Sequence, residues 1–209
     1  GGSFLLMKVA LEGVSVGQVL WAREILGALT LGLIMLIGRH KLPREPVVWA
    51  HFVVIALLNG VIPHGLFAWS QLHIASGLAG IYNSVTPIAT AVLAVALFRV
   101  ERLNRSQFFG VVLGILGVVV IIAPWQLSDL GGSFWGQVAC IVASICYGFA
   151  IGYLRKFISH RPIPGITVAF MNIGMSGAIM LLLTPFVAVG PVDLSWQVVG
   201  SLVLLGALG

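Results

Sequence analysis

Residues 82–121 read YNSVTPIATAVLAVALFRVERLNRSQFFGVVLGILGVVVI and form two apolar runs separated by a short basic segment. An α-helix needs about 20 apolar residues to cross the ~30 Å hydrocarbon core of a bilayer, and each run has roughly that length. The segment between them carries Arg99, Arg102 and Arg105. This stretch therefore predicts two membrane-spanning helices joined by a basic loop. Asn104, with Gln107 three residues later, is typical of a capping pair at the start of the second helix.

The same pattern extends over the whole chain. Of the 209 residues, 59% are hydrophobic and 8% are charged, whereas a typical soluble domain has about 25% charged residues. Breaks at charged or Pro/Gly-rich positions separate eight apolar segments: 1–12, 17–38, 48–72, 76–98, 105–124, 134–155, 165–188 and 195–209. The first and last are too short to span a membrane, so we expect each to be part of a longer helix. The predicted fold class is an all-α polytopic membrane protein.

Composition also limits the partners and cofactors. The net charge of +5 comes from basic residues in short loops between apolar runs, which argues against a nucleic-acid partner. Cys140 and Cys146 lie in one apolar run and suit neither a disulfide framework nor a zinc site. The chain has no metal-ligand, phosphate-loop or nucleotide-binding motif. We therefore predict no cofactor, no metal and no ATP-driven step.

The basic residues predict how the chain is oriented in the membrane. Three alternate loops hold three each: Arg39, Lys41 and Arg44; Arg99, Arg102 and Arg105; Arg155, Lys156 and Arg161. The other loops lack Lys and Arg and carry Asp129 and Asp193. Because cytoplasmic loops are enriched in Lys and Arg, we expect the loops with Lys41, Arg102 and Arg161 to be cytoplasmic. The predicted location is the inner cell membrane.

An internal repeat appears when the chain is shifted against itself by about 148 positions. The matched pairs are Lys8 with Lys156, Gly17 with Gly165 and Glu24 with Asn172. The first copy, residues 1–124, contains five helices, so the second copy, residues 125–209, would cross the membrane in the opposite sense. Inverted repeats of this kind are the recurrent architecture of secondary transporters.

Three stretches resemble the EamA-type members of the drug/metabolite transporter superfamily: GGSFLLMKVALEG at 1–13, the run at 82–121, and GQVACIVASICYGFAIGYLRK at 136–156. The resemblance is most specific over residues 87–117. It implies ten helices in two inverted five-helix halves, of which about eight are present here, and it suggests efflux of amino acids or related metabolites. Many relatives have a proline near the start of the second helix, where this chain reads Val14-Ser15-Val16-Gly17. Because of that difference, the resemblance does not predict how the first turn of the second helix is formed.

Lys8 and Arg23 depart from the loop pattern because they lie inside predicted helices. Ionisable side chains inside a membrane are costly and commonly functional. The guanidinium of Arg23 could hold a substrate carboxylate or phosphate through two parallel hydrogen bonds. The alternative is a structural ion pair with Glu12 or Glu24, or a side chain that reaches the membrane interface.

Two predicted helices carry an asparagine four residues before a proline: Asn59 before Pro63, and Asn83 before Pro87. Because proline has no N–H to donate, it frees the carbonyl four residues earlier, and such a group needs protein or a wet cavity around it. Helical spacing also predicts three stripes, formed by Arg23, Gly27 and Thr30; by Asn83, Thr86 and Thr90; and by Gln137, Cys140, Ser144 and Tyr147. The alternative role for polar residues here is hydrogen bonding between helices.

The predicted substrate-binding residues are Lys8, Arg23, Asn59, His64, Asn83, Thr86, Thr90, Ser144, Tyr147 and Asn172. His64 could couple transport to protons, because histidine titrates near neutral pH, although a neutral, hydrogen-bonded histidine is the alternative. Gly110, Gly114 and Gly117 form a small-residue face that favours packing within the bundle, with a homodimer as the alternative.

These features predict a secondary-active exporter of small metabolites that works by alternating access at a central cavity in the lipid bilayer. One alternative is a membrane-embedded enzyme, because Gly174-Met175-Ser176-Gly177 resembles the nucleophile motif of rhomboid proteases. A serine nucleophile needs a base, and no histidine follows His160 in the chain. We therefore predict that the protein is not an enzyme. A passive channel is the other alternative.

Overall fold

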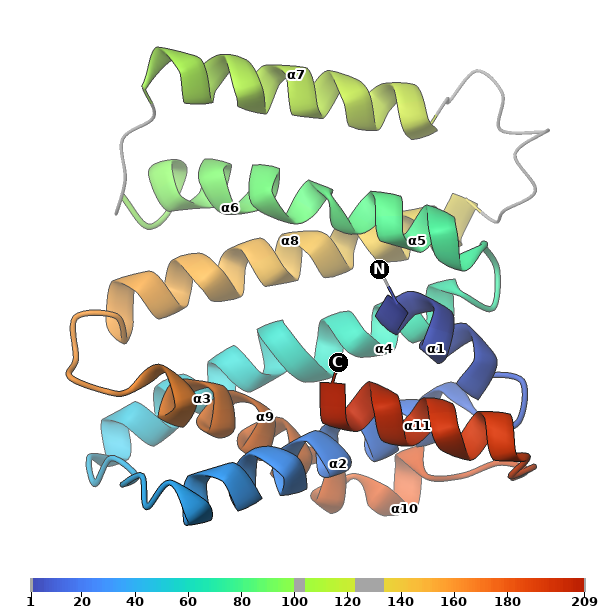
Figure 1. Ribbon diagram of the computed structural model, residues 1–209. Helices are drawn as coiled ribbons and strands as arrows, with labels where there is room; N and C mark the ends of the chain where they lie inside the picture. The colour runs from blue at the N-terminus through green and yellow to red at the C-terminus, as the bar shows by residue number, and fades with distance from the viewer. Residues whose placement is uncertain (1, 100–103, 123–133, 209) are drawn as a thin grey trace.

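The computed structural model describes residues 2–99, 104–122 and 134–208, and all regular structure in these residues is helical. The helices form one bundle (Figure 1). Their bounds are α1 Gly2–Ala10, α2 Val16–Ile37, α3 Pro46–Ala56, η1 Leu57–Val61, α4 Ile62–Ser70, α5 Ser76–Asn83, α6 Val85–Ala96, α7 Arg105–Ile122, α8 Phe134–Phe157, α9 Gly165–Leu182, α10 Thr184–Val187 and α11 Trp196–Leu208. Each predicted apolar segment corresponds to one of these helices or to a consecutive group of them.

The bundle has the surface of a membrane protein. Five helical stretches are long and apolar enough to cross a bilayer: Val16–Ile37, Pro46–Ser70, Ser76–Ala96, Phe134–Phe157 and Gly165–Leu182. Their outer faces expose large apolar side chains, for example Leu36 at 78% and Leu182 at 80% exposure. Contiguous apolar surface of this kind is unfavourable in water and favourable in lipid. The polytopic helical fold class is therefore confirmed.

The loops gather at two ends of the bundle (Figure 1). At one end, the loop after α2 meets the loop after α8 through an ion pair between Glu45 and Arg161. At the other end, the backbone N–H of Asp193 donates to the carbonyl of Gly13 at 2.8 Å. The loop that contains Lys41 therefore lies at the same end of the bundle as Arg161, as the alternation of basic loops predicts. Arg102 and Asp129 lie outside the described residues, and which end faces the cytoplasm stays a prediction.

Side-chain caps begin two of the helices. Asn104 and Gln107 exchange reciprocal hydrogen bonds of 2.9 and 2.8 Å at the start of α7, which confirms the predicted capping pair. Ser15 and Gln18 form the same arrangement at the start of α2. This capping box satisfies the backbone N–H groups of Ser15 and Gln18, so α2 begins with a regular side-chain cap.

The two proline-containing spans are irregular where the sequence predicts it. In the third span the π-helical turn η1 contains Asn59 and precedes Pro63. In the fourth span α5 ends at Asn83, and α6 begins at Val85, two residues before Pro87. Proline has no backbone N–H to donate, and its ring crowds the carbonyl of the preceding turn. The regular ladder of helical hydrogen bonds is therefore disturbed at both places. Both disturbances lie at the level of the cavity described below.

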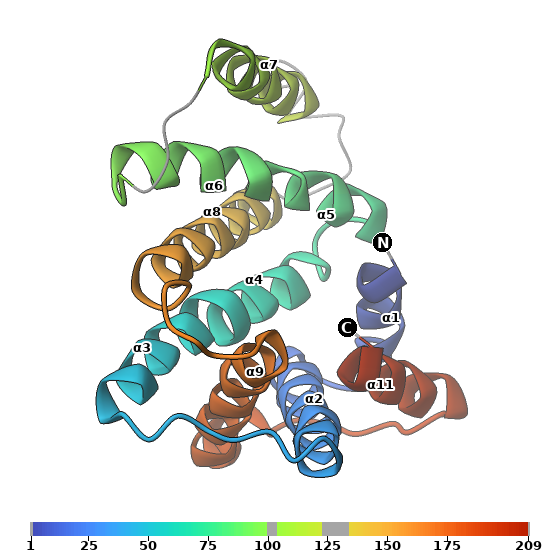
Figure 2. The same cartoon turned by 60° about the vertical axis from the view of Figure 1, so that its left-hand side comes forward.

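Close approaches between helices hold the bundle together. α2 packs along α9, where a Cβ on Gly177 would lie 3.0 Å from the Cβ of Ala28. α8 lies between α4 and α6, and α1 packs on α11. α7 lies at the edge of the bundle, next to α6 (Figure 2). Of the predicted glycine face on α7, Gly114 contacts Ile88, whereas a Cβ on Gly110 or Gly117 would meet no atom within 4 Å. A homodimer through this face stays a prediction.

Candidate functional site

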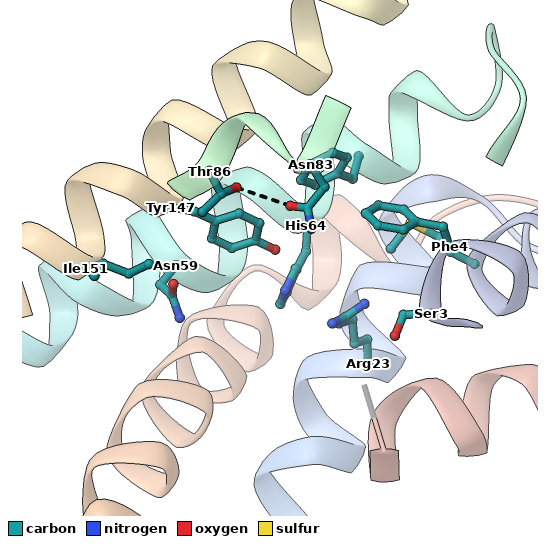
Figure 3. Close-up of a pocket in the computed structure, with 11 residues that line it drawn as sticks. Ser3, Phe4, Arg23, Asn59, His64, Asn83, Thr86, Tyr147 and Ile151 are labelled. Atoms are coloured by element: carbon teal, nitrogen blue, oxygen red, sulfur yellow. Dashed lines mark hydrogen bonds between the residues drawn. The ribbon is translucent and has the colours of Figure 1, made fainter. Parts of the chain in front are cut away.

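A cavity of about 330 Å³ lies in the middle of the bundle (Figure 3). Its lining residues are Ser3, Phe4, Met7, Arg23, Asn59, His64, Phe67, Asn83, Thr86, Tyr147 and Ile151. Six of the ten predicted substrate-binding residues are among them, from α2, η1, α4, α5, α6 and α8. Residues far apart in the sequence therefore converge on one space.

The polar side chains of this cavity are mainly hydrogen-bond donors. Within the described residues, the guanidinium of Arg23, the amide of Asn59 and the hydroxyl of Tyr147 make no hydrogen bond. Asn83 accepts a hydrogen bond from Thr86 through Oδ1 at 3.3 Å, which leaves its N–H groups available. These four groups can all donate to a ligand oxygen. The site is therefore suited to a carboxylate or phosphate.

Aromatic packing holds Tyr147 in place. Its ring stacks on Phe67 with centroids 5.9 Å apart and an angle of 25° between the planes. It also meets His64 edge to face, with centroids 6.1 Å apart. Both arrangements are favourable for aromatic pairs and restrict the ring. The hydroxyl and the adjacent apolar wall therefore keep a fixed position in the cavity.

His64 is bound to Glu24, a residue for which the sequence predicted a repeat match with Asn172 and a possible ion pair with Arg23 but no place in the binding site. Nδ1 of His64 contacts Oε1 of Glu24, and the two residues are 7% and 1% exposed. With Glu24 ionised, its carboxylate only accepts hydrogen bonds and Nδ1–H of His64 is the donor. Oε2 of Glu24 is buried and has no partner among the described residues. Glu24 is the only acidic residue inside a full-length predicted span, and that signal could have identified it.

The structure does not contain the ion pair between Arg23 and Glu12 or Glu24 that was one of the alternatives, within the described residues. The guanidinium of Arg23 makes no ion pair in the described part of the chain, and Glu24 is engaged by His64 instead. Arg23 also lines a second cavity of about 200 Å³, together with Glu24, Gly27 and Thr30. The predicted stripe of Arg23, Gly27 and Thr30 therefore forms one surface.

Four predicted residues lie outside the central cavity. Nζ of Lys8 donates to the carbonyl of Gln71, so this ammonium is held at the end of α4. The hydroxyl of Thr90 donates to its own helix, and that of Ser144 donates to the carbonyl of Tyr82 at 3.0 Å. The structure thus gives these side chains hydrogen-bonding roles.

Asn172 is the fourth of these residues and lies on α9. Its carbonyl accepts a hydrogen bond from Ser176 at 3.1 Å, and its side-chain Oδ1 is buried without a partner among the described residues. Two other members of the predicted α8 stripe also bond between helices. Tyr82 donates to Gln137 at 2.8 Å, and Cys140 donates to Ser70 at 3.1 Å. Only Tyr147 of that stripe reaches the cavity.

Ser176 belongs to the motif that resembles a protease nucleophile. It is fully buried, and its hydroxyl lies within hydrogen-bond distance of the carbonyls of Ala56 and Asn172. A hydroxyl has a single proton, and here it is directed to carbonyl oxygens and not to a base. Activation by a general base requires the opposite arrangement. The serine therefore joins α9 to α3.

Comparisons with known proteins agree with this architecture. The chain is 26% identical over 212 residues to an uncharacterized transporter of Bacillus subtilis (strain 168), YoaV, with 100% of this chain and 70% of that protein covered. It is 25% identical to an uncharacterized transporter of Archaeoglobus fulgidus, with 75% and 55% covered. An uncharacterized transporter of Synechocystis is 24% identical, with 78% and 54% covered. The chain thus spans about half the length of the latter two relatives.

The pattern of the EamA-like transporter family matches residues 1–123. This range is more than half of the chain. It contains five of the six predicted substrate-binding residues that line the central cavity: Arg23, Asn59, His64, Asn83 and Thr86. The helical membrane fold, the named transporters and the family match point to the same conclusion. The chain belongs to the EamA-like transporter family.

Proposed function

We propose that the protein is a secondary-active transporter that exports small carboxylate-bearing metabolites, such as amino acids or related compounds. The observation that carries this proposal is the set of donors around the central cavity that have no partner within the described part of the chain, above all the guanidinium of Arg23. Arginine can hold a carboxylate with two parallel hydrogen bonds, which fixes the orientation of the ligand. None of the lining residues is acidic, so a carboxylate meets no direct charge repulsion there.

The size and walls of the cavity also favour small metabolites. Ligand sites commonly have volumes of about 300–1,000 Å³, and this cavity lies near the lower limit with about 330 Å³. Phe4, Phe67 and Ile151 line it beside the polar groups. An apolar portion of a metabolite can pack there while its carboxylate reaches Arg23.

Alternating access is supported by the way the helices pair. The 148-residue offset relates α1 to α8, α2 to α9, and the third span to α11. α1 packs on α11, and α8 packs on α4 of the third span, so the two contacts correspond to each other. α2 and α9 pack directly together, as expected for elements next to a symmetry axis. These contacts favour two inverted repeats, residues 1–124 and 125–209, that move against each other about the cavity.

A transport assay on the complete protein in liposomes tests the proposal. Vesicles loaded with a mixture of amino acids and other metabolites are placed in a proton gradient, and each compound is measured on both sides over time. We expect a carboxylate-bearing compound to move against its own concentration gradient. Flux that only follows the concentration gradient would favour the channel alternative. Selective flux of cations without a carboxylate would contradict the proposed substrate class.

A further inference from the structure

The contact between Glu24 and His64 is a buried titratable pair to which the proposed carboxylate site gives no role. The two residues are 40 positions apart and come from α2 and α4. Glu24 is 1% exposed, and one of its two carboxylate oxygens has no partner within the described residues. A charged carboxylate inside a membrane is costly unless nearby groups neutralise it. A structural pair would be expected to satisfy both oxygens, and this pair does not.

The pair lies between two cavities. His64 lines the cavity of about 330 Å³, and Glu24 lines the neighbouring cavity of about 200 Å³. Arg23 lines both. Figure 3 shows His64 and Arg23 entering the central cavity from different helices. Because Nδ1 of His64 is bound to Glu24, Nε2 is the ring nitrogen left for a ligand or water in the cavity.

Few other titratable groups face the pair. Arg23 is its neighbour on α2, and Tyr147 on α8 contacts the ring of His64. α9 and α11, which pack on α2, carry no titratable side chain. On α1, Lys8 is held at the carbonyl of Gln71. The charged groups next to His64 among the described residues are therefore one carboxylate, that of Glu24, and one guanidinium, that of Arg23.

We propose that Glu24 and His64 form a proton-binding site through which the transporter exchanges protons for its substrate. A proton from water adds to Nε2 of neutral His64, while Nδ1–H continues to donate to the carboxylate of Glu24. The product is an imidazolium next to a carboxylate, and loss of the Nε2 proton to water restores the starting state. The exchange rests on the proposed function, whereas proton binding by the pair does not.

The exchange follows from what His64 offers in each state. Neutral His64 presents Nε2 as a hydrogen-bond acceptor opposite the donors of Arg23. An amino acid with its carboxylate on Arg23 can then place its ammonium at Nε2. Protonated His64 has no acceptor and repels the ammonium, so proton and amino acid compete for the same position. Competition of this kind allows an inward proton gradient to drive export.

Histidine-selective NMR of the complete protein in lipid nanodiscs tests the proton site without any substrate. These 209 residues contain five histidines, and the signal of His64 is assigned by its loss in a variant that lacks this residue. We expect the His64 signals to change from those of a neutral ring to those of an imidazolium as the pH is lowered. His64→Gln and His64→Asn should each remove this titration. Because either variant assigns the signal to His64, the test needs only one of them to fold. His51→Gln is the matched control, because His51 bonds to Tyr153 on another surface.

Charge variants give opposite and equally specific outcomes. Arg23→Gln should raise the titration midpoint of His64 by about one pH unit, because it removes a repelling positive charge. Glu24→Gln should lower the midpoint by a similar amount or more, because it removes the stabilising carboxylate. Glu12→Gln, on an exposed residue, should leave it unchanged. A wild-type protein without a titrating His64, or midpoints that do not move in these two directions, would overturn the proposal.

The exchange itself is tested in liposomes loaded with a mixture of amino acids. Acidification of the receiving side should accelerate efflux in the wild type and in His51→Gln but have no effect in His64→Gln. Equal acceleration in His64→Gln would overturn the coupling. Because the NMR titration needs no transport, its result and the result of the metabolite screen for the proposed function can be told apart.

Discussion

Arg23 is the residue on which the proposed substrate recognition depends most directly. It lies well inside α2, and its guanidinium makes neither an ion pair nor a hydrogen bond within the described residues. A cation kept in this position without an internal partner imposes a cost on folding that a ligand or water must offset. Arg23 lines both cavities, so a ligand bound in either cavity can provide this compensation.

Replacement of Arg23 separates a ligand contact from a structural role. Arg23→Lys keeps the charge but loses the two-pronged geometry, so we expect the fold to be retained and transport to fall by about 10- to 100-fold, as for loss of a charged hydrogen bond. The measurement is initial flux per folded molecule in liposomes. Arg161→Lys, at the surface ion pair with Glu45, is the matched control and should transport normally. Normal flux in Arg23→Lys would remove this residue from the site.

The residue scale also marks the limit of prediction from this sequence. The stripe of Arg23, Gly27 and Thr30 follows from helical spacing alone, and the structure places it on one cavity surface. The contact between Glu24 and His64 does not follow from spacing, because it depends on how α2 lies against α4. Likewise, helical spacing puts Ser144 on the same face as Tyr147 but does not show that a carbonyl of α5 accepts its hydroxyl.

At the scale of elements, α8 is a central support, because it contacts both the third and the fourth span. It approaches α6 closely at Gly148, where an added Cβ would lie 2.8 Å from backbone atoms of Ala89 and Thr90. Backbone atoms cannot move aside as a flexible side chain can. Small residues at such crossings allow helices to approach closely inside a membrane. Tyr147 of α8 and Thr86 of α6 both line the cavity near this crossing.

Gly148→Ala should therefore destabilise the bundle by about 1–3 kcal/mol, the usual cost of overpacking. Gly117→Ala on α7 is the matched control, because its Cβ would meet no described atom within 4 Å. Alanine forms helix better than glycine by up to about 1 kcal/mol, so the control should be neutral or slightly stabilising. Thermal unfolding in detergent measures both. A Gly148→Ala variant as stable as Gly117→Ala would show that α8 and α6 are farther apart than described.

The lengths of the elements were largely predictable, and their internal irregularities were predictable only where proline causes them. Apolar runs between charged breaks give the spans because hydrocarbon thickness sets helix length. Pro63 and Pro87 mark the disturbed turns, but the π-helical form of η1 and the close approach of its Gly60 to Ser176 do not follow from the sequence pattern. The predicted span 165–188 ends at Leu182 and restarts as α10, because Pro185 interrupts its helical ladder.

At the scale of the whole molecule, the loop contacts divide the described bundle into two ends. The ion pair between Glu45 and Arg161 joins two basic loops, and the hydrogen bond from Asp193 to Gly13 joins two loops without Lys or Arg. The structure thus decides which loops share a side. The second contact involves only backbone atoms and therefore does not depend on the charge of these loops. The positive-inside rule then predicts that the basic end is cytoplasmic.

Cysteine labelling of the complete protein in intact cells tests this orientation. Cys140 and Cys146 are first replaced by alanine, and single cysteines are then placed at Lys41, Arg161 and Asp193. A membrane-impermeant thiol reagent added from outside should label position 193 and leave positions 41 and 161 unlabelled until the membrane is opened. The paired contacts require positions 41 and 161 to behave alike in either orientation. External labelling of both would invert the topology, whereas labelling of only one would contradict the arrangement of the helices, because the ion pair between Glu45 and Arg161 cannot cross a bilayer.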